Sequence, residues 1–147
     1  MSAFCPSCGA SWAEIGDCRT IFESLLALEF TRPAHGKVHF LTVACFMIQH
    51  GLYSDEGLVW IRSMLQAYFD QALTPEQLRQ LAARDTGNDV RTWKVNRAPD
   101  ARPLPRINWH VTIADVALGY EDAESYCEWV RRWGRAVLQE MAPLLPE

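Results

Sequence analysis

The chain has 147 residues, of which 49% are hydrophobic and 22% are charged, and its formal net charge is −4. This length is typical of one domain with a sizeable core, and the composition excludes a largely disordered protein. No apolar run approaches the roughly 18 residues that a membrane span needs, and the acidic balance argues against general nucleic-acid binding, which needs a dense basic surface.

The five cysteines indicate the environment in which the protein works. The N-terminus lacks the basic region followed by an apolar stretch that is typical of a secretion signal. We therefore expect a cytoplasmic protein, in which thiols stay reduced and clustered cysteines favour a metal over disulfides. An odd number of cysteines fits this expectation better than a disulfide framework does.

The pattern of apolar residues predicts an all-α fold, a helical bundle of about five to six helices with an N-terminal zinc knuckle. We expect one domain that covers residues 1–147. Within it, the predicted order is a zinc-knuckle head (1–17), four helices (18–85), a basic proline-containing loop (86–109) and C-terminal helices (110–147).

The head carries the motif Cys5-Pro-Ser-Cys8-Gly9. The two-residue spacer lets both thiolates bind one ion, and Gly9 allows a left-handed turn that directs the chain away from it. We expect Trp12 to pack over such a site. The same cysteine spacing also serves thiol–disulfide exchange, but that role normally places the pair at the start of a helix in a strand–helix unit. We therefore favour Zn²⁺ as the cofactor and keep a redox pair as the alternative.

The first helix is predicted to begin at Cys18, after Asp17, and to end before Pro33. A thiolate at this position lies near the positive end of the helix dipole, which favours its charged, metal-binding form. Glu29 lies close to the apolar stripe, and we expect it to cap the next helix or to pair with Arg32. The predicted stripe consists of Ile21, Phe22, Leu25, Leu26 and Phe30.

The second helix is predicted from about Gly36 to Gln49 and is apolar on almost every side, which is typical of a central helix. His39 and His50 lie at its two ends, roughly 16 Å apart along a straight helix, so one ion cannot bind both. We predict His39 as the fourth metal ligand, with a hydrogen-bonding role in the core as the alternative. His50 is expected to bond the last carbonyls of the helix.

Residues that favour helix starts mark the remaining helices. We expect Cys45 and Cys127 within these helices to be unreactive core thiols. The predicted start signals are Ser54 for the third helix, Thr74, Pro75 and Gln77 for the fourth at about 75–84, Thr112 for a short fifth, and Glu121 and Asp122 for the last.

The segment between Asp85 and Trp109 is locally basic and rich in residues that favour irregular structure. A basic loop with an aromatic side chain can stack a base or clamp a phosphate. The alternative is a solvated connector whose arginines pair with acidic helices. The nucleic-acid candidates are Arg91, Trp93, Lys94, Arg97 and Arg102.

Several of these motifs together resemble an uncharacterised, mainly bacterial family known only as a domain of unknown function. The resemblance rests on Cys5-Pro-x-Cys8-Gly9, Cys18, His39-x-Leu41-Thr42-Val43, Gln49-His50 and Thr112-Ile113-Ala114-Asp115-Val116. It implies a helical body, and it implies that Cys5, Cys8, Cys18, His39 and His50 correspond to recurring polar positions of the family. Gly51 replaces the family's proline, and residues 86–106 match poorly. The resemblance implies no activity.

The first functional hypothesis is a structural zinc site in an accessory or interaction protein, with Cys5, Cys8, Cys18 and His39 as ligands. Four protein ligands leave no open coordination position, so the metal would stabilise the fold and activate no water. A protein partner fits this hypothesis; the sequence identifies neither the partner nor the oligomeric state.

Two other hypotheses remain open. With only three protein ligands, a zinc-bound water would make the protein a metal-dependent hydrolase, with Glu29, His50 and His110 as candidate catalytic acids or bases. Three thiolates make a poor Lewis acid, however, and the chain has no HExxH-type pair. The remaining hypothesis is a nucleic-acid-binding or regulatory module that uses the basic loop over 91–106.

Overall fold

The structure, a computed structural model, describes residues 4–12, 16–86 and 93–147. These residues form seven α-helices and one short 3₁₀ helix, and no β-strand is present among them beyond two isolated bridges, so the expectation of an all-α fold is confirmed. The helices are α1 (Cys18–Thr31), α2 (Pro33–Gly36), α3 (His39–Gln49), α4 (Asp55–Gln71), α5 (Pro75–Thr86), α6 (Ile113–Gly119) and α7 (Ala123–Glu140), with η1 (Ala142–Leu144) at the end.

The helix that sequence reasoning missed is α2, a single turn between α1 and α3. Pro33 occupies its first position, where the missing N–H of proline carries no cost. The predicted helix over 36–49 therefore begins later, at His39. The turn is tight, because a Cβ at Gly36 would lie 2.7 Å from the backbone oxygen of Glu29.

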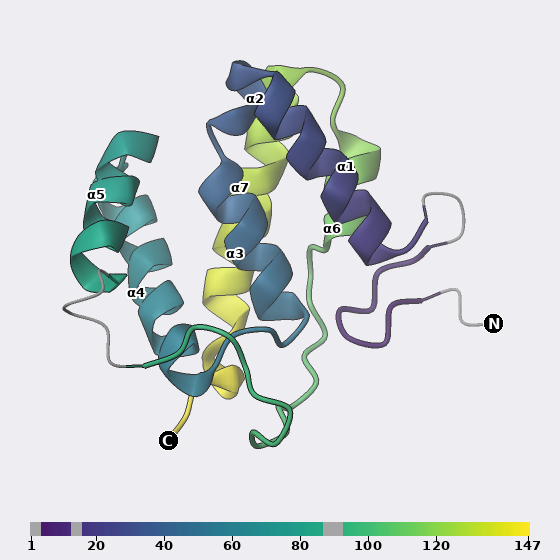
Figure 1. Cartoon of the computed structure of the whole chain (residues 1–147). Coiled ribbons are helices and arrows are strands. Elements are labelled where there is room, and N and C mark those ends of the chain that lie inside the picture. Colours follow the sequence, from purple (N-terminus) through teal and green to yellow (C-terminus); the bar gives the residue numbers. More distant parts are fainter. Residues whose placement is uncertain (1–3, 13–15, 87–92) are drawn as a thin grey trace.

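This short connection makes α1 and α3 antiparallel neighbours. In Figure 1, α1 runs from the N-terminal segment towards α2, and α3 runs back in the opposite direction. The C-terminal end of α3 thereby returns to the level at which α1 begins. This arrangement determines which histidine lies near the cysteines.

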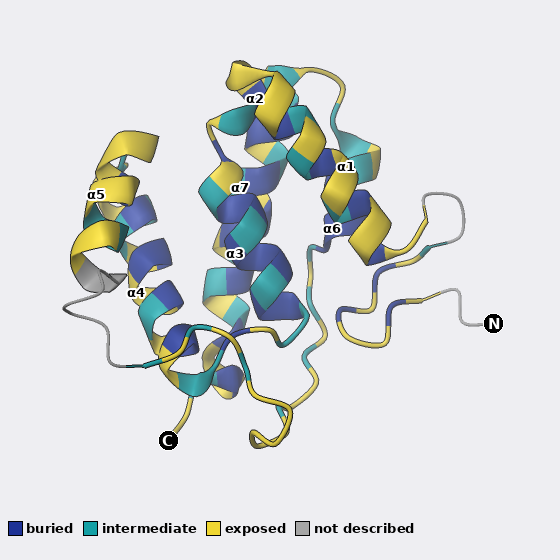
Figure 2. Cartoon of the chain, in the orientation of Figure 1, coloured by how far each residue is buried: buried dark blue, intermediate teal, exposed yellow. Residues whose placement is uncertain are grey.

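The core is centred on α7, which packs against α3, α6, α2 and α4. Trp133 of α7 is fully buried, and its Nε1 donates a hydrogen bond to Oε1 of Gln49 at 3.1 Å. The amide nitrogen of Gln49 in turn donates to the backbone oxygen of Val111 at 2.8 Å. Figure 2 shows that the buried residues of α3 and α7 face one another, whereas the outer faces of α1 and α5 are exposed.

The face of α1 that is buried differs from the predicted stripe. Ile21 and Leu25 are buried as expected, but Phe30 is 87% exposed and Glu29 is buried in its place. Adjacent residues on a helix point about 100° apart, so a small rotation of α1 exchanges Glu29 and Phe30 between the core and the surface. The buried carboxylate accepts hydrogen bonds from side chains of α3 and α7.

The segment after residue 92 crosses one end of the bundle and connects to α6 (Figure 1). It is held at the start of α4, where the Nη1 atom of Arg97 lies 3.0 Å from Oδ1 of Asp55 and the Nε atom of Arg102 lies 3.0 Å from Oδ2 of the same residue. Arg97 also donates to the backbone oxygen of Tyr53. Among the described helices, none has both the length and the apolar character that crossing a membrane requires.

Candidate metal centre

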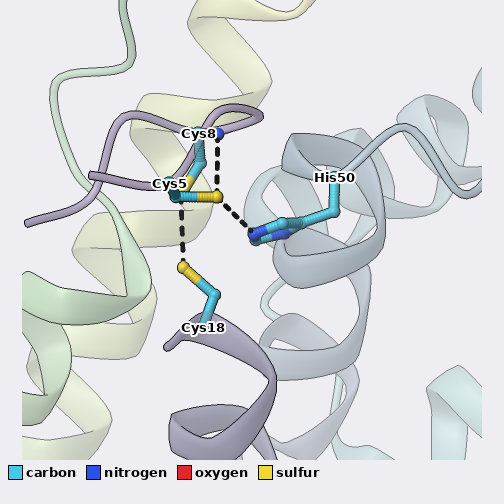
Figure 3. Close-up of side chains that lie close together, drawn as sticks. All are labelled: Cys5, Cys8, Cys18 and His50. Carbon is cyan, nitrogen blue, oxygen red and sulfur yellow. Dashed lines mark hydrogen bonds between the residues drawn. The ribbon is translucent and has the colours of Figure 1, made fainter. Parts of the chain in front are cut away.

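Three thiols and one imidazole converge where the N-terminal segment meets the ends of α1 and α3 (Figure 3). The sulfur atoms of Cys5, Cys8 and Cys18 and a ring nitrogen of His50 all lie within 4.8 Å of one another. The three cysteines are buried and His50 is half-buried. We call these four residues the Cys3His cluster.

Two of the distances within the cluster can be compared with those of a tetrahedral metal site. Nε2 of His50 lies 3.6 Å from the sulfur of Cys5, and the sulfur atoms of Cys8 and Cys18 are 3.6 Å apart. A tetrahedron with Zn–S bonds of about 2.3 Å and a Zn–N bond of about 2.0 Å has edges of roughly 3.5–3.8 Å between its ligand atoms. These two distances lie in that range, and the four donor atoms together could hold a metal ion.

A tight turn positions the first two cysteines. The backbone N–H of Cys5 donates to the oxygen of Ala10 at 2.8 Å, and the N–H of Gly9 donates to the oxygen of Cys5 at 2.9 Å. Gly9 has a φ of +80°, which glycine adopts at no steric cost. The N–H of Cys8 points at the sulfur of Cys5 at 3.5 Å. The turn thus directs both thiols towards the same point, as the sequence predicted.

Cys18 is the first residue of α1, whose N-terminus is capped by Asp17. Nε1 of Trp12 donates a hydrogen bond to the sulfur of Cys18 at 3.2 Å. The hydrogen bond from Cys8, opposed by burial and helped by the hydrogen bond from Trp12, lowers the pKa of Cys18 to about 4. The same bond from Cys8 to Cys18, together with burial, raises the pKa of Cys8. Of these two thiols, Cys18 is therefore the one that loses its proton more readily.

His50 reaches the cluster from the C-terminal end of α3, where it is the C-cap residue. Its Nδ1 lies 2.7 Å from the backbone oxygen of Phe46, and its Nε2 faces Cys5. A carbonyl only accepts hydrogen bonds, so Nδ1 carries the proton and Nε2 presents its lone pair, the tautomer that a metal ligand requires. The ring also stacks on that of Phe46 at a centroid distance of 4.2 Å.

The fourth member of the cluster is therefore His50, whereas the sequence analysis placed His39 there. His39 lies at the opposite end of α3, where its Nδ1 is 2.8 Å from Oε1 of Glu29. The physical reason is the antiparallel arrangement of α1 and α3, which brings the end of α3 back to Cys18. A short connection between two helices is the signal that points to this arrangement. The bond from His50 to a terminal carbonyl of the helix is present as predicted.

Glu29 belongs to a separate buried network. Its two carboxylate oxygens accept hydrogen bonds from His39, from the hydroxyl of Thr42 at 2.6 Å and from the hydroxyl of Tyr126. The expectation that Glu29 caps the next helix or pairs with Arg32 is therefore wrong. The hydrogen bond to Glu29, opposed by partial burial, raises the pKa of His39 above its usual value.

The candidate catalytic residues Glu29, His50 and His110 do not form one site. Glu29 follows Cys18 by eleven positions in the same helix, which corresponds to roughly 16 Å along the axis. His110 is exposed, and its Nδ1 lies 2.9 Å from Oε2 of Glu140. His50 is the one candidate catalytic residue of these three that belongs to the Cys3His cluster.

The described candidates in the basic loop contact other parts of the chain or are exposed. Arg97 and Arg102 pair with Asp55, as expected for a connector whose arginines contact an acidic helix start. Lys94 is exposed, and the ring of Trp93 lies 6.0 Å from that of Trp60 between centroids. Arg91 lies outside the described residues.

The other two cysteines lie in the helical core, away from the cluster. Cys45 is fully buried in α3, and burial raises the pKa of its thiol. Cys127 is buried in α7, and its thiol donates to the backbone oxygen of Ala34 at 3.4 Å. Both positions agree with the expectation of core thiols.

A model of a protein family described as a family of unknown function (DUF5946) matches residues 3–142. No curated protein matches the chain, and no solved structure matches it. The matched residues include all four members of the Cys3His cluster.

Proposed function

The chain belongs to this family of unknown function, and we propose that it is a zinc-binding protein in which the metal has a structural role. The observation that carries the proposal is the Cys3His cluster, whose donor atoms all lie within 4.8 Å of one another and whose histidine has its Nε2 lone pair available. Thiolate and imidazole donors suit zinc, whereas calcium and magnesium prefer oxygen.

A structural role follows from the number and kind of ligands. Three thiolates and one imidazole complete a four-coordinate shell, which leaves no position for a reactive water. Metal binding would instead link the N-terminal segment to the start of α1, through Cys18, and to the end of α3, through His50. Structural zinc contributes on the order of 10 kcal/mol to folding in small domains, because the unfolded chain has no preformed site.

The N-terminal segment has no regular helix or strand among its described residues. Ser7 and Gly9 are exposed, and the buried side chains beside them are Cys5, Cys8 and Ala10. A turn of this length without a regular helix or strand needs an additional link to stay ordered, and zinc supplies such a link in small motifs. We propose that the resulting protein is a cytoplasmic accessory or interaction module.

Two alternatives have less support. A metal-dependent hydrolase would need an open coordination position, and thiolate ligands reduce the Lewis acidity of zinc. A nucleic-acid-binding role for the basic loop would rely on Arg97 and Arg102, both of which pair with Asp55. The net charge of −4 also gives no general attraction to a polyanion.

The test is elemental analysis and X-ray absorption at the zinc edge, on protein purified under reducing conditions. We expect one zinc per chain with the three sulfur and one nitrogen neighbours of the cluster. His50→Ala should remove the nitrogen neighbour, whereas His39→Ala, at the other end of the same helix, should retain it. Absence of metal from the wild type would refute the proposal, and loss of nitrogen only in His39→Ala would refute the ligand assignment.

A further inference from the structure

A cavity of about 340 Å³ lies between α3, α4 and α5, and the Cys3His cluster does not take part in it. Much of its lining is apolar or aromatic, which is typical of sites for small organic molecules. The apolar residues that form its walls include Phe40, Val43, Tyr53, Trp60, Ile61 and Leu78.

Positive charge gathers around this apolar cavity. Lys37, His39 and Arg79 line it, and no carboxylate occurs among its described lining residues. In the described part of the chain, neither Lys37 nor Arg79 forms an ion pair. The cavity therefore combines an apolar interior with two cationic side chains, Lys37 and Arg79, that have no ion-pair partner among the described residues, whereas His39 is paired with Glu29.

His39 is held in a defined orientation at this cavity. Its Nδ1 is bonded to Glu29, which leaves Nε2 as the ring nitrogen that is open to a ligand. The side chain of His39 is 48% exposed, whereas that of Glu29 is 1% exposed. A buried carboxylate behind the ring fixes the orientation of the imidazole.

Trp60 provides a probe of this cavity. Its indole ring lies between α4 and the cavity, and it is one of the lining residues. Its Nε1 is buried and has no hydrogen-bond partner among the described residues, so the N–H signal depends mainly on the packing of the ring. A molecule that fills the cavity would contact the ring and change that signal.

We propose that the cavity binds a small organic carboxylate with an aromatic or aliphatic body. The apolar body packs between Phe40 of α3 and Trp60 of α4, and the carboxylate lies among Lys37, His39 and Arg79. The apolar walls select the body, and the cationic groups select the negative charge over a neutral or positive one. This site is independent of the proposed zinc centre.

The test uses the indole N–H signals of protein labelled with ¹⁵N-tryptophan, titrated with 3-phenylpropionate and with octanoate. The Trp60 signal is assigned by its loss in Trp60→Phe. We expect a saturable change at Trp60 with at least one of the two carboxylates, and dissociation constants about tenfold higher, or more, for the corresponding alcohols and ammonium compounds. No saturation with either carboxylate would overturn the proposal.

Two variants separate charge recognition from apolar binding. Arg79→Gln should raise the dissociation constant of the carboxylate about tenfold, since it removes one cationic group from the site. Arg62→Gln, an exposed arginine of α4 that does not line the cavity, should leave it unchanged. Equal affinities for carboxylate, alcohol and ammonium probes, or an unchanged affinity in Arg79→Gln, would overturn the proposal. The ¹H–¹⁵N spectrum of each variant verifies that it is folded.

Discussion

The hydroxyl group of Tyr126 in α7 donates a hydrogen bond to the carboxylate of Glu29 in α1, across 97 positions of the chain. Both side chains are buried, and Thr42 and His39 donate to the same carboxylate from α3. A buried carboxylate is stable only when such donors replace its lost water. This group of residues therefore joins three helices at one point.

Removing the Tyr126 hydroxyl should destabilise the protein. In Tyr126→Phe the Glu29 carboxylate stays buried with one donor fewer, and hydrogen bonds to charged groups are worth about 1.5–3 kcal/mol. We expect the free energy of unfolding in urea to fall by about that amount. Tyr120→Phe, which alters a less buried hydroxyl with no hydrogen bond among the described residues, should change it by less than about 0.5 kcal/mol. Equal effects of the two substitutions would contradict this assignment.

Gln49 should be more important for stability than an ordinary glutamine. Gln49→Leu would leave Nε1 of Trp133 without its partner in the core, and the oxygen of Val111 would lose a donor. Each buried group left unpaired costs about 1–3 kcal/mol, so we expect a loss of at least about 2 kcal/mol in the free energy of unfolding. Gln66→Leu in the exposed face of α4 is the matched control. A loss no larger than that of the control would show that the Gln49 bonds are dispensable.

Trp12 should tune the affinity of the proposed zinc site. Its Nε1–H donates to the sulfur of Cys18, and outer hydrogen bonds of this kind are typically worth 10- to 100-fold in metal affinity, as an order of magnitude. We expect Trp12→Phe to weaken zinc binding by about that range in competition with a chelator, with zinc stoichiometry retained at saturation. Trp129→Phe, in α7, should leave the affinity unchanged. The same affinity in Trp12→Phe and wild type would mean that this bond does not act on the metal.

The pairing of His39 with Glu29 predicts a pH dependence. The hydrogen bond to Glu29 raises the pKa of His39 in the folded protein above the unfolded value of about 6.5. Its stabilising contribution is therefore complete below about pH 6.5 and is lost as the pH rises through the raised pKa. Histidine NMR titration should give a lower pKa for His39 in Glu29→Gln than in wild type. Glu23→Gln, on the exposed face of α1, should not alter it; an unchanged pKa in Glu29→Gln would refute the coupling.

Asp55 should hold the basic loop in place with little effect on global stability. Hydrogen bonds from Arg102 and Arg97 lower the pKa of Asp55, so its contribution is present above about pH 4 and is lost as the pH falls through the lowered value. Because the pairs are partly exposed, we expect Asp55→Asn to cost less than about 1 kcal/mol. Amide exchange at Arg97 should become faster, whereas Asp70→Asn should leave it unchanged. Unchanged exchange in Asp55→Asn would contradict this role.

The features that sequence reasoning predicted correctly depend on contacts within a few residues. The hydroxyl of Ser54 accepts from the N–H of Gly57 at 2.9 Å, and Thr74 and Gln77 bond each other's backbone N–H groups, so these helix starts follow from local chemistry. The turn at Gly9 is equally local. Such features can be predicted because both partners lie in the same short stretch of sequence.

The features that it missed depend on how distant helices meet. Glu29 enters the core and Phe30 does not, because Tyr126 and Thr42 offer hydrogen bonds that no pattern around position 29 reveals. The choice between His39 and His50 likewise depends on the direction in which one helix packs against another. Periodicity identifies the helix but not which of its ends approaches Cys18.

The order of the cluster residues along the chain has a consequence for biosynthesis. Translation proceeds from the N-terminus, so Cys5, Cys8 and Cys18 are all synthesised before His50, which follows Cys18 by 32 positions. Until α3 is complete and has folded back against α1, the nascent chain presents three thiols without their imidazole. The cluster is therefore complete only once α1 and α3 have packed against each other. Before that point the three thiols can be oxidised or can bind another ligand.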